Sequence, residues 1–206
     1  MSADMIRCSK TYNPAAIADG VFVILSDAAI RQGSAFALDG VGLITCAHVV
    51  TDGSGAAYRD LYALRSGSDT RRVPVRVVTA HSVVDLAILE APELPGRSLA
   101  RSSAAVRQLD QVLLAGYPQH NLGDTLSVRP AVVAGFRQWH GVRRVLVNAG
   151  IVAGMSGGPV LDAQSGVIGV AVTGADSDGQ VDATENHGFV PIDAIDLLET
   201  PSIVPR

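Results

Sequence analysis

The chain has 206 residues, of which 48% are hydrophobic and 17% are charged. This composition is typical of a globular protein with a sizeable core, and it excludes a disordered chain. The net charge of −4 and the aromatic content of 4% exclude a basic, aromatic-rich surface, so we expect no nucleic-acid partner.

Residues 1–12 are polar, and the apolar run at residues 21–25 is too short for a secretion signal or a membrane span. We therefore expect no membrane partner and a cytoplasmic protein. Cys8 and Cys46 are too few for a disulfide framework and are predicted to be free thiols.

Short segments rich in Val and Ile follow one another along the chain, separated by Gly, Asp and Pro. We expect strands at residues 21–25, 34–38, 42–45, 73–78, 86–90, 111–115, 131–136, 144–147 and 167–172. Many short strands with turn residues between them predict an all-β sandwich or barrel. Residues 51–60 and 93–103 are predicted loops. A helix is expected from Pro191, with Ile192, Ile195, Leu197 and Leu198 as its apolar face.

The motif Gly-Met-Ser-Gly-Gly-Pro at residues 154–159 surrounds Ser156 with little side-chain bulk. Backbone N–H groups there can converge on one point, as an oxyanion requires, so we predict an oxyanion hole from the backbone of Gly154, Met155 and Ser156. A plain glycine-rich turn is the alternative. The motif also matches the nucleophile elbow of α/β-hydrolase esterases, but the following glycines and proline disfavour the helix that an elbow needs.

Two further motifs precede the serine. His48 ends the small-residue stretch after the strand at residues 42–45, and Asp85 leads directly into the strand at residues 86–90. Each residue alone is better explained by a structural role. The order His, Asp, Ser is that of the chymotrypsin-type triad, which differs from the order in subtilisin and in α/β-hydrolases.

With these motifs the chain resembles bacterial trypsin-like serine peptidases, and most of all the protease domain of the HtrA (Deg) group. Residues 33–36 and 43–50 resemble the family's "GSGF…LTNAHVV", and residues 85–89 resemble "DLALL". Residues 111–118, 148–159 and 188–192 resemble three further family motifs, in the correct order. We expect no peptide-binding PDZ domain after the region of similarity.

The resemblance implies two six-stranded antiparallel β-barrels with a short C-terminal helix. The barrels would comprise residues 21–105 and 106–199, after an N-terminal extension at residues 1–20. The linker-like tail at residues 200–206 suggests an additional domain or a regulatory partner. Met155 departs from the family, which has Asn or Asp there, so activation through a salt bridge to a new N-terminus is not expected.

The resemblance also implies peptide-bond hydrolysis, with Ser156 as nucleophile, His48 as base and Asp85 as its partner. No metal or organic cofactor is expected. The pocket before the cut would involve Gly150, Ile151, Ala171, Val172, Thr173 and Gly188. Gly150 stands where trypsin-type enzymes carry an acidic residue. We therefore expect the pocket to accept a substrate with a small or apolar side chain before the cut.

Several alternatives remain open at this point. The acidic loop at residues 176–185 could reach the pocket rim and favour a substrate with a basic side chain. Calcium binding by this loop is a weaker alternative, and a solvated surface loop is the preferred interpretation. His187 is expected to pack rather than contact substrate, and His81, His120 and His140 are read as surface or structural. The functional alternative is a silent or latent trypsin-like fold that serves as a peptide-binding or regulatory module.

Overall fold

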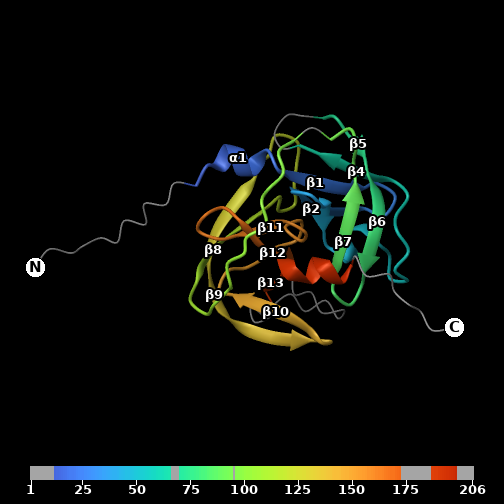
Figure 1. The fold of residues 1–206 in the computed structure, drawn as a ribbon. Helices are drawn as coiled ribbons and strands as arrows, with labels where there is room; N and C mark the ends of the chain where they lie inside the picture. The colour runs from blue at the N-terminus through green and yellow to red at the C-terminus, as the bar shows by residue number, and fades with distance from the viewer. Residues whose placement is uncertain (1–11, 66–69, 95, 173–186, 199–206) are drawn as a thin grey trace, which may run out of the picture.

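The computed structural model describes residues 12–65, 70–94, 96–172 and 187–198. A short helix, α1 (Pro14–Ala18), begins this part of the chain, and Asn13 caps it by accepting the Ala16 N–H at 3.2 Å. Almost all the remaining regular structure is β (Figure 1). Within these residues, no helix has the length and apolar character that a membrane crossing requires.

The first half of the chain forms one antiparallel sheet of seven strands in the order β5-β4-β1-β2-β3-β7-β6. Its strands are β1 (Val21–Ser26), β2 (Arg31–Leu38), β3 (Gly42–Thr45), β4 (Leu61–Leu64), β5 (Val73–Pro74), β6 (Arg76–His81) and β7 (Leu86–Glu90). A bulge in the β6–β7 pairing lies between Val77 and Thr79. Such bulges bend a strand and increase its twist, which helps the sheet to curl.

The second half closes into a six-stranded barrel in the order β10-β13-β12-β11-β8-β9. Its strands are β8 (Gln111–Gly116), β9 (Ser127–Trp139), β10 (Val142–Val147), β11 (Pro159–Leu161), β12 (Val167–Val172) and β13 (Gly188–Pro191). A 3₁₀ helix, η2 (Ile192–Leu197), follows β13 and packs against β12. Arg101 holds this helix through Asp193 at 2.9 Å and Asp196 at 2.7 Å.

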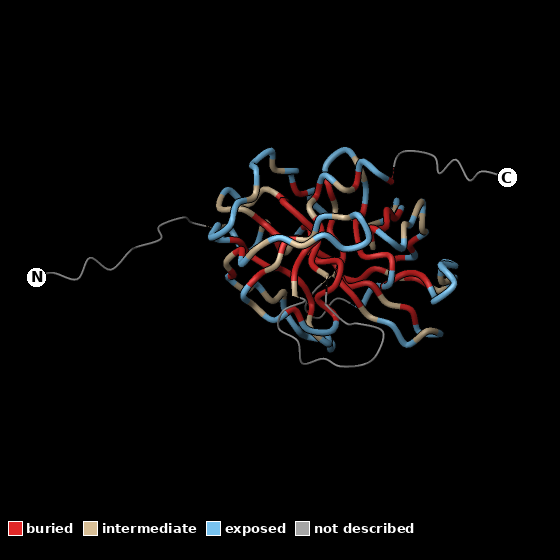
Figure 2. The backbone as a smooth tube through the Cα atoms, turned by 90° about the horizontal axis from the view of Figure 1, so that it is seen from below, coloured by how far each residue is buried: buried red, intermediate tan, exposed pale blue. Residues whose placement is uncertain are grey.

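Two apolar clusters form the core. The larger one fills the first sheet and continues into the second half through residues such as Tyr117, Val170 and Ile195. The smaller one lies inside the barrel and includes Phe189 and Met155. Figure 2 shows the buried segments gathered at the centre of the molecule with the exposed turns around them. The two β units therefore share a continuous apolar interface.

The structure confirms the chymotrypsin-like all-β prediction, with differences in detail. The first unit is a curled seven-stranded sheet, and only the second is a closed six-stranded barrel. The terminal helix is 3₁₀ because Ile192, Ile195 and Leu198 are the buried residues, and a spacing of three matches its period. Leu197, expected on the apolar face, is 56% exposed. The domain boundaries stay predictions, although β1–β7 and β8–β13 do form separate sheets.

Candidate active site

His48 lies on a single helical turn, α2 (Ala47–Val50), immediately after β3. Ala47, Val49 and Val50 are buried in this turn and anchor it to the core. The His48 side chain points away from that core and is 43% exposed. The alternation of small apolar residues with one histidine thus places an imidazole at the surface on a firmly held backbone.

Asp85 ends the turn that joins β6 to β7. Its N–H donates to the His81 carbonyl at 2.8 Å, and the Val84 N–H donates to His81 Nδ1 at 3.2 Å. His81 therefore has a local role in building this turn, in line with its structural interpretation. Asp85 itself adopts a left-handed conformation with φ of +61°, which Asp tolerates better than most residues with a Cβ.

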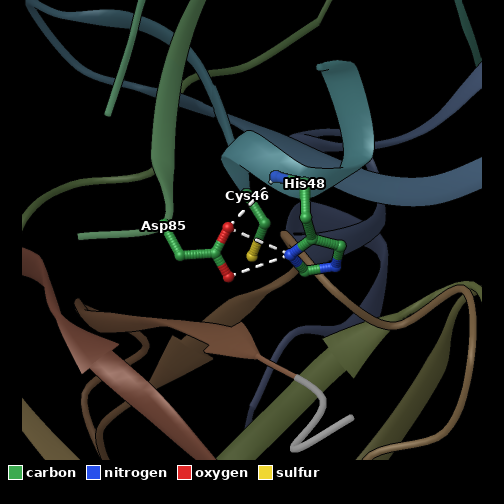
Figure 3. Close-up of side chains that lie close together, drawn as sticks. All are labelled: Cys46, His48 and Asp85. Atoms are coloured by element: carbon green, nitrogen blue, oxygen red, sulfur yellow. Dashed lines mark hydrogen bonds and ion pairs between the residues drawn. The ribbon is translucent and has the colours of Figure 1, made fainter. Parts of the chain in front are cut away.

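The Asp85 carboxylate binds both the ring and the backbone of His48 (Figure 3). His48 Nδ1 lies 2.9 Å from Oδ2 and 3.0 Å from Oδ1, and the His48 N–H donates to Oδ1 at 3.1 Å. An ionised carboxylate only accepts hydrogen bonds, so Nδ1 carries the ring proton. The other nitrogen, Nε2, is then the acceptor of the neutral ring, which is the form that a general base requires.

Ser156 is positioned by contacts across the interface between the two β units. The N–H of Ser34 on β2 donates to the Ser156 carbonyl at 2.8 Å. The Ser34 hydroxyl donates to the Gly154 carbonyl at 2.7 Å and accepts the Tyr117 N–H at 2.8 Å. Ser34 is fully buried, so these bonds are shielded from water. The first sheet thus fixes the loop that carries the serine of the second barrel.

Three glycines let the backbone pack tightly around Ser156. A Cβ on Gly154 would come within 2.4 Å of the Tyr117 carbonyl oxygen, and one on Gly158 within 2.0 Å of the Ala115 carbonyl oxygen. A Cβ on Gly157 would meet the Ser34 carbonyl oxygen at 2.1 Å. Gly154 and Gly157 also have φ near +90°, which strains other residues. The glycine-rich motif is therefore required by space as well as by backbone conformation.

Met155, between Gly154 and Ser156, is fully buried in the barrel core. Its N–H donates to the Val152 carbonyl at 3.0 Å, so it does not fit the predicted oxyanion role. The Gly154 N–H, by contrast, has no backbone acceptor among the described residues. Apolar packing of Met155 takes the place of the ion pair that an acid at this position would make.

A cavity of about 730 Å³ brings the three predicted catalytic side chains together. His48 and Asp85 line it from the first sheet, and Ser156 and Gly154 line it from the second unit. Ser156 is 4% exposed, so its access to solvent is through this cavity. Three motifs that are far apart in the sequence therefore meet at one cavity.

The residues predicted to form the substrate pocket occupy different environments. Val172 and Gly188 line the cavity. Ile151 and Ala171 do not, because both are buried in the barrel core. Gly150 is exposed and lies outside the cavity lining, and Thr173 falls outside the described residues, as does the loop at residues 176–185.

A group of basic and aromatic residues in the cavity wall was not predicted from the sequence. Arg137, Trp139 and Arg144 line it from the β9–β10 hairpin, together with His140 in the turn, for which the sequence predicts a surface or structural role. Arg31 at the start of β2 joins them. No motif marked these residues, because their meeting depends on how the hairpin pairs. His187, by contrast, packs as expected: its Nδ1 accepts the Ile151 N–H at 3.1 Å.

Cys46 lies beside the His48–Asp85 pair, and the ligand atoms of the three residues are within 4.8 Å of one another. Such a set has the donors for a thiophilic metal ion. The environment opposes that use. Burial raises the pKa of the Cys46 thiol well above its ordinary value, with a further contribution from the Asp85 charge. The thiol also lies 3.3 Å from the Ala171 carbonyl, to which it donates. The charge of Arg144 acts on both Cys46 and Asp85 and would repel a cation. Cys46 is thus a free, buried thiol that packs behind the site; Cys8 lies outside the described residues.

Two β units that share a site of this composition define a protein of the chymotrypsin-like double-barrel class. Residues 33–170 match the model of the trypsin-like peptidase domain. The chain belongs to this family.

Solved structures of HtrA-type and related proteases have the same fold. The Rv3671c protease from M. tuberculosis in its active form is 23% identical, with a TM-score of 0.68, over 89% of this chain and 81% of that one. The HtrA-type protease AlgW with tripeptide is 24% identical, with a TM-score of 0.66, over 87% of this chain and 58% of that one. The serine endoprotease from Yersinia pestis is 22% identical, with a TM-score of 0.65, over 89% of this chain and 62% of that one.

Proposed function

We propose that the protein is a serine endopeptidase that hydrolyses peptide bonds through Ser156, His48 and Asp85. The observation that carries the proposal is the His48 ring, bound to Asp85 through Nδ1 at 2.9 Å, in the cavity that Ser156 also lines. A peptidase of this family acts on a protein or peptide substrate.

In the proposed reaction, Ser156 Oγ attacks the carbonyl carbon of the peptide while His48 Nε2 takes its proton. Asp85 keeps the ring proton on Nδ1 and stabilises the imidazolium that forms. The carbonyl oxygen becomes an oxyanion, for which the N–H groups of Gly154 and Ser156 are the proposed donors. His48 then protonates the leaving amine, and water attacks the acyl-enzyme in the same way.

A small or apolar side chain is proposed for the residue before the cut. Val172 and Gly188 support this preference, because both line the cavity. Val172 contributes an apolar side chain, and Gly188 contributes backbone alone. A series of fluorogenic peptides that differ only in the residue before the cut, which is Ala, Val, Leu, Lys or Glu, would measure it through kcat/KM.

A fluorophosphonate probe tests the proposed activity directly, because it reacts with an activated serine. Wild-type protein is expected to be labelled and Ser156→Ala is not. Ser165→Ala is a matched control, since Ser165 lies in a turn between β11 and β12 and should leave labelling unchanged. Intact folding with no labelling of wild type would refute the proposal and favour a silent, peptide-binding fold.

A further inference from the structure

The β9–β10 hairpin places two arginines side by side in the wall of the cavity. Its turn consists of His140 and Gly141, both with positive φ, of 47° and 80°. Positive φ at both central residues is typical of a two-residue type I′ turn, which fixes the register of the strands that it joins. As a result, Arg137 stands directly opposite Arg144.

Strand alternation directs this pair into the cavity. Directly paired residues share a face of the sheet, and so do residues two apart. Arg137, Trp139, Arg144 and Leu146 are on one face, and all four line the cavity. Val145 and Val147, on the other face of β10, are buried in the barrel core. Both arginine side chains therefore leave the sheet on the cavity side.

Such a pair has a cost in the free protein. Like charges directly opposite each other destabilise an antiparallel pair. Arg144 Nη1 is, in addition, buried without a hydrogen-bond partner in the described part of the chain, and a buried unpaired donor destabilises the folded state. Burial also lowers the pKa of Arg144 from its ordinary value, against the attraction of Asp85. These costs would be removed by an anion between the two side chains.

The rest of the cavity wall fits the same ligand. Gln32 Nε2 is a second buried donor without a partner, and Gln32 lines this cavity too. Three arginines line it in a chain with a net charge of −4. Asp85 is the sole acidic side chain among the described lining residues, and it is already bound to His48. The cavity wall therefore offers two buried donors, Arg144 Nη1 and Gln32 Nε2, that have no hydrogen-bond partner in the described part of the chain.

We propose that Arg144, with Arg137 opposite it, binds the carboxylate of an Asp or Glu side chain of the substrate near the scissile bond. This inference rests on the proposed peptidase function, since it names a substrate feature of the same cavity. Guanidinium and carboxylate form charge-assisted, often paired hydrogen bonds, which are stronger than neutral ones. The reaction at Ser156 is unchanged; the arginine pair selects which peptides are held there.

The test compares peptides that differ only by Glu or Gln. A cleaved peptide is varied at the three positions on each side of the cut, and the Glu/Gln ratio of kcat/KM is measured at each one. At one position the wild-type ratio is expected to be about ten- to hundredfold, the size of a hydrogen bond to a charged group. Arg144→Gln should reduce that ratio to about one, since a neutral amide gains little from the charge.

Arg143→Gln is the matched control. Arg143 is the next residue on β10 but lies on the opposite face, over the Phe136 ring at 4.1 Å. Its removal changes the net charge equally and should leave the Glu/Gln ratio as in wild type. An equal fall in both variants would show a general effect of charge and would overturn the assignment to Arg144.

Binding keeps the inference testable if cleavage is not observed. Fluorescence anisotropy of the labelled Glu and Gln peptides on Ser156→Ala measures acid recognition without turnover. Tighter binding of the Glu peptide, lost in Ser156→Ala/Arg144→Gln, supports the inference even where the peptidase proposal fails. Equal affinities, or a preference for Lys, overturn it. A Glu preference at the residue directly before the cut, lost with Arg144, supports acid recognition and refutes the apolar preference proposed for that position.

Discussion

Replacement of Asp85 by Asn tests the proposed triad with little disturbance of the backbone. Asp85 has φ of +61°, a conformation that Asn tolerates as well as Asp. The Asn oxygen can still accept the His48 N–H, which lies 3.1 Å from Oδ1. Its NH₂ group then stands at the Oδ2 position, 2.9 Å from Nδ1. A donor there forces the ring proton onto Nε2, so the ring can no longer accept the proton of Ser156.

The geometry also gives the size of the effect. Unit charges 2.9 Å apart attract by roughly 6 kcal/mol at an effective dielectric constant of about 20. The His48 side chain is 43% exposed, so screening lowers this to about 3–5 kcal/mol. At 1.36 kcal/mol for each factor of ten, the lost stabilisation of the imidazolium alone slows acylation by about 10²–10⁴-fold. The wrong tautomer adds to this, and we expect a loss of about 10⁴-fold in kcat.

The assay is single-turnover acylation by a fluorogenic ester or peptide, followed by stopped flow. Asp124→Asn is the matched control, because Asp124 accepts the Asn121 N–H in an exposed turn and does not line the cavity. Thermal unfolding of both variants should resemble that of wild type. If folded Asp85→Asn kept more than about a tenth of the wild-type acylation rate, the proposed role of Asp85 would be wrong.

Three further substitutions give measurable changes in stability. Gly157→Ala is expected to abolish soluble, folded protein, because the new Cβ would lie 2.1 Å from the Ser34 carbonyl oxygen and the backbone there has φ of +88°. The control Gly53→Ala should fold normally, since Gly53 is exposed and a Cβ there meets nothing within 4 Å. Met155→Ala should lower the free energy of unfolding by about 2–5 kcal/mol in urea, since Met155 is fully buried. A loss below about 1 kcal/mol would show that the core does not depend on it. Arg144→Gln should raise that free energy by about 0.2–1 kcal/mol through relief of the Arg137–Arg144 repulsion, whereas a fall would show that the pair is not strained.

Local pattern was enough to predict those strands whose own residues determine them. The predicted bounds of residues 42–45, 86–90 and 167–172 agree with β3, β7 and β12. These segments are almost entirely apolar and are bounded by turn residues. β4 (Leu61–Leu64) and β11 (Pro159–Leu161) were not predicted, because they are short and owe their strand conformation to neighbours, β1 and β12 among them. Tertiary pairing decides such segments, and no local pattern carries it.

The same limit divides the candidate site. The positions of His48, Asp85 and Ser156 could be predicted together because each lies in a motif of its own. Arg137 and Arg144 could not, because their pairing follows from the backbone angles of the His140–Gly141 turn. Ile151 was misplaced for a related reason. Its position near Ser156 in the sequence does not determine the direction of its side chain, which is buried in the barrel core.

Ser34 explains why motifs that are far apart in sequence have to occur together. It lies 120 residues before Gly154, yet its hydroxyl donates to the Gly154 carbonyl, and its carbonyl accepts the Thr45 hydroxyl at 2.7 Å. A Cβ on Gly33 beside it would come within 2.6 Å of the Val49 side chain and within 3.2 Å of the Ser156 carbonyl oxygen, so this close approach needs glycine. Ser34 thus joins the β unit that includes His48 to the loop that carries Ser156. The alignment of nucleophile and base therefore depends on how the two β units dock, so a substitution at this interface should impair acylation even where His48, Asp85 and Ser156 are all intact.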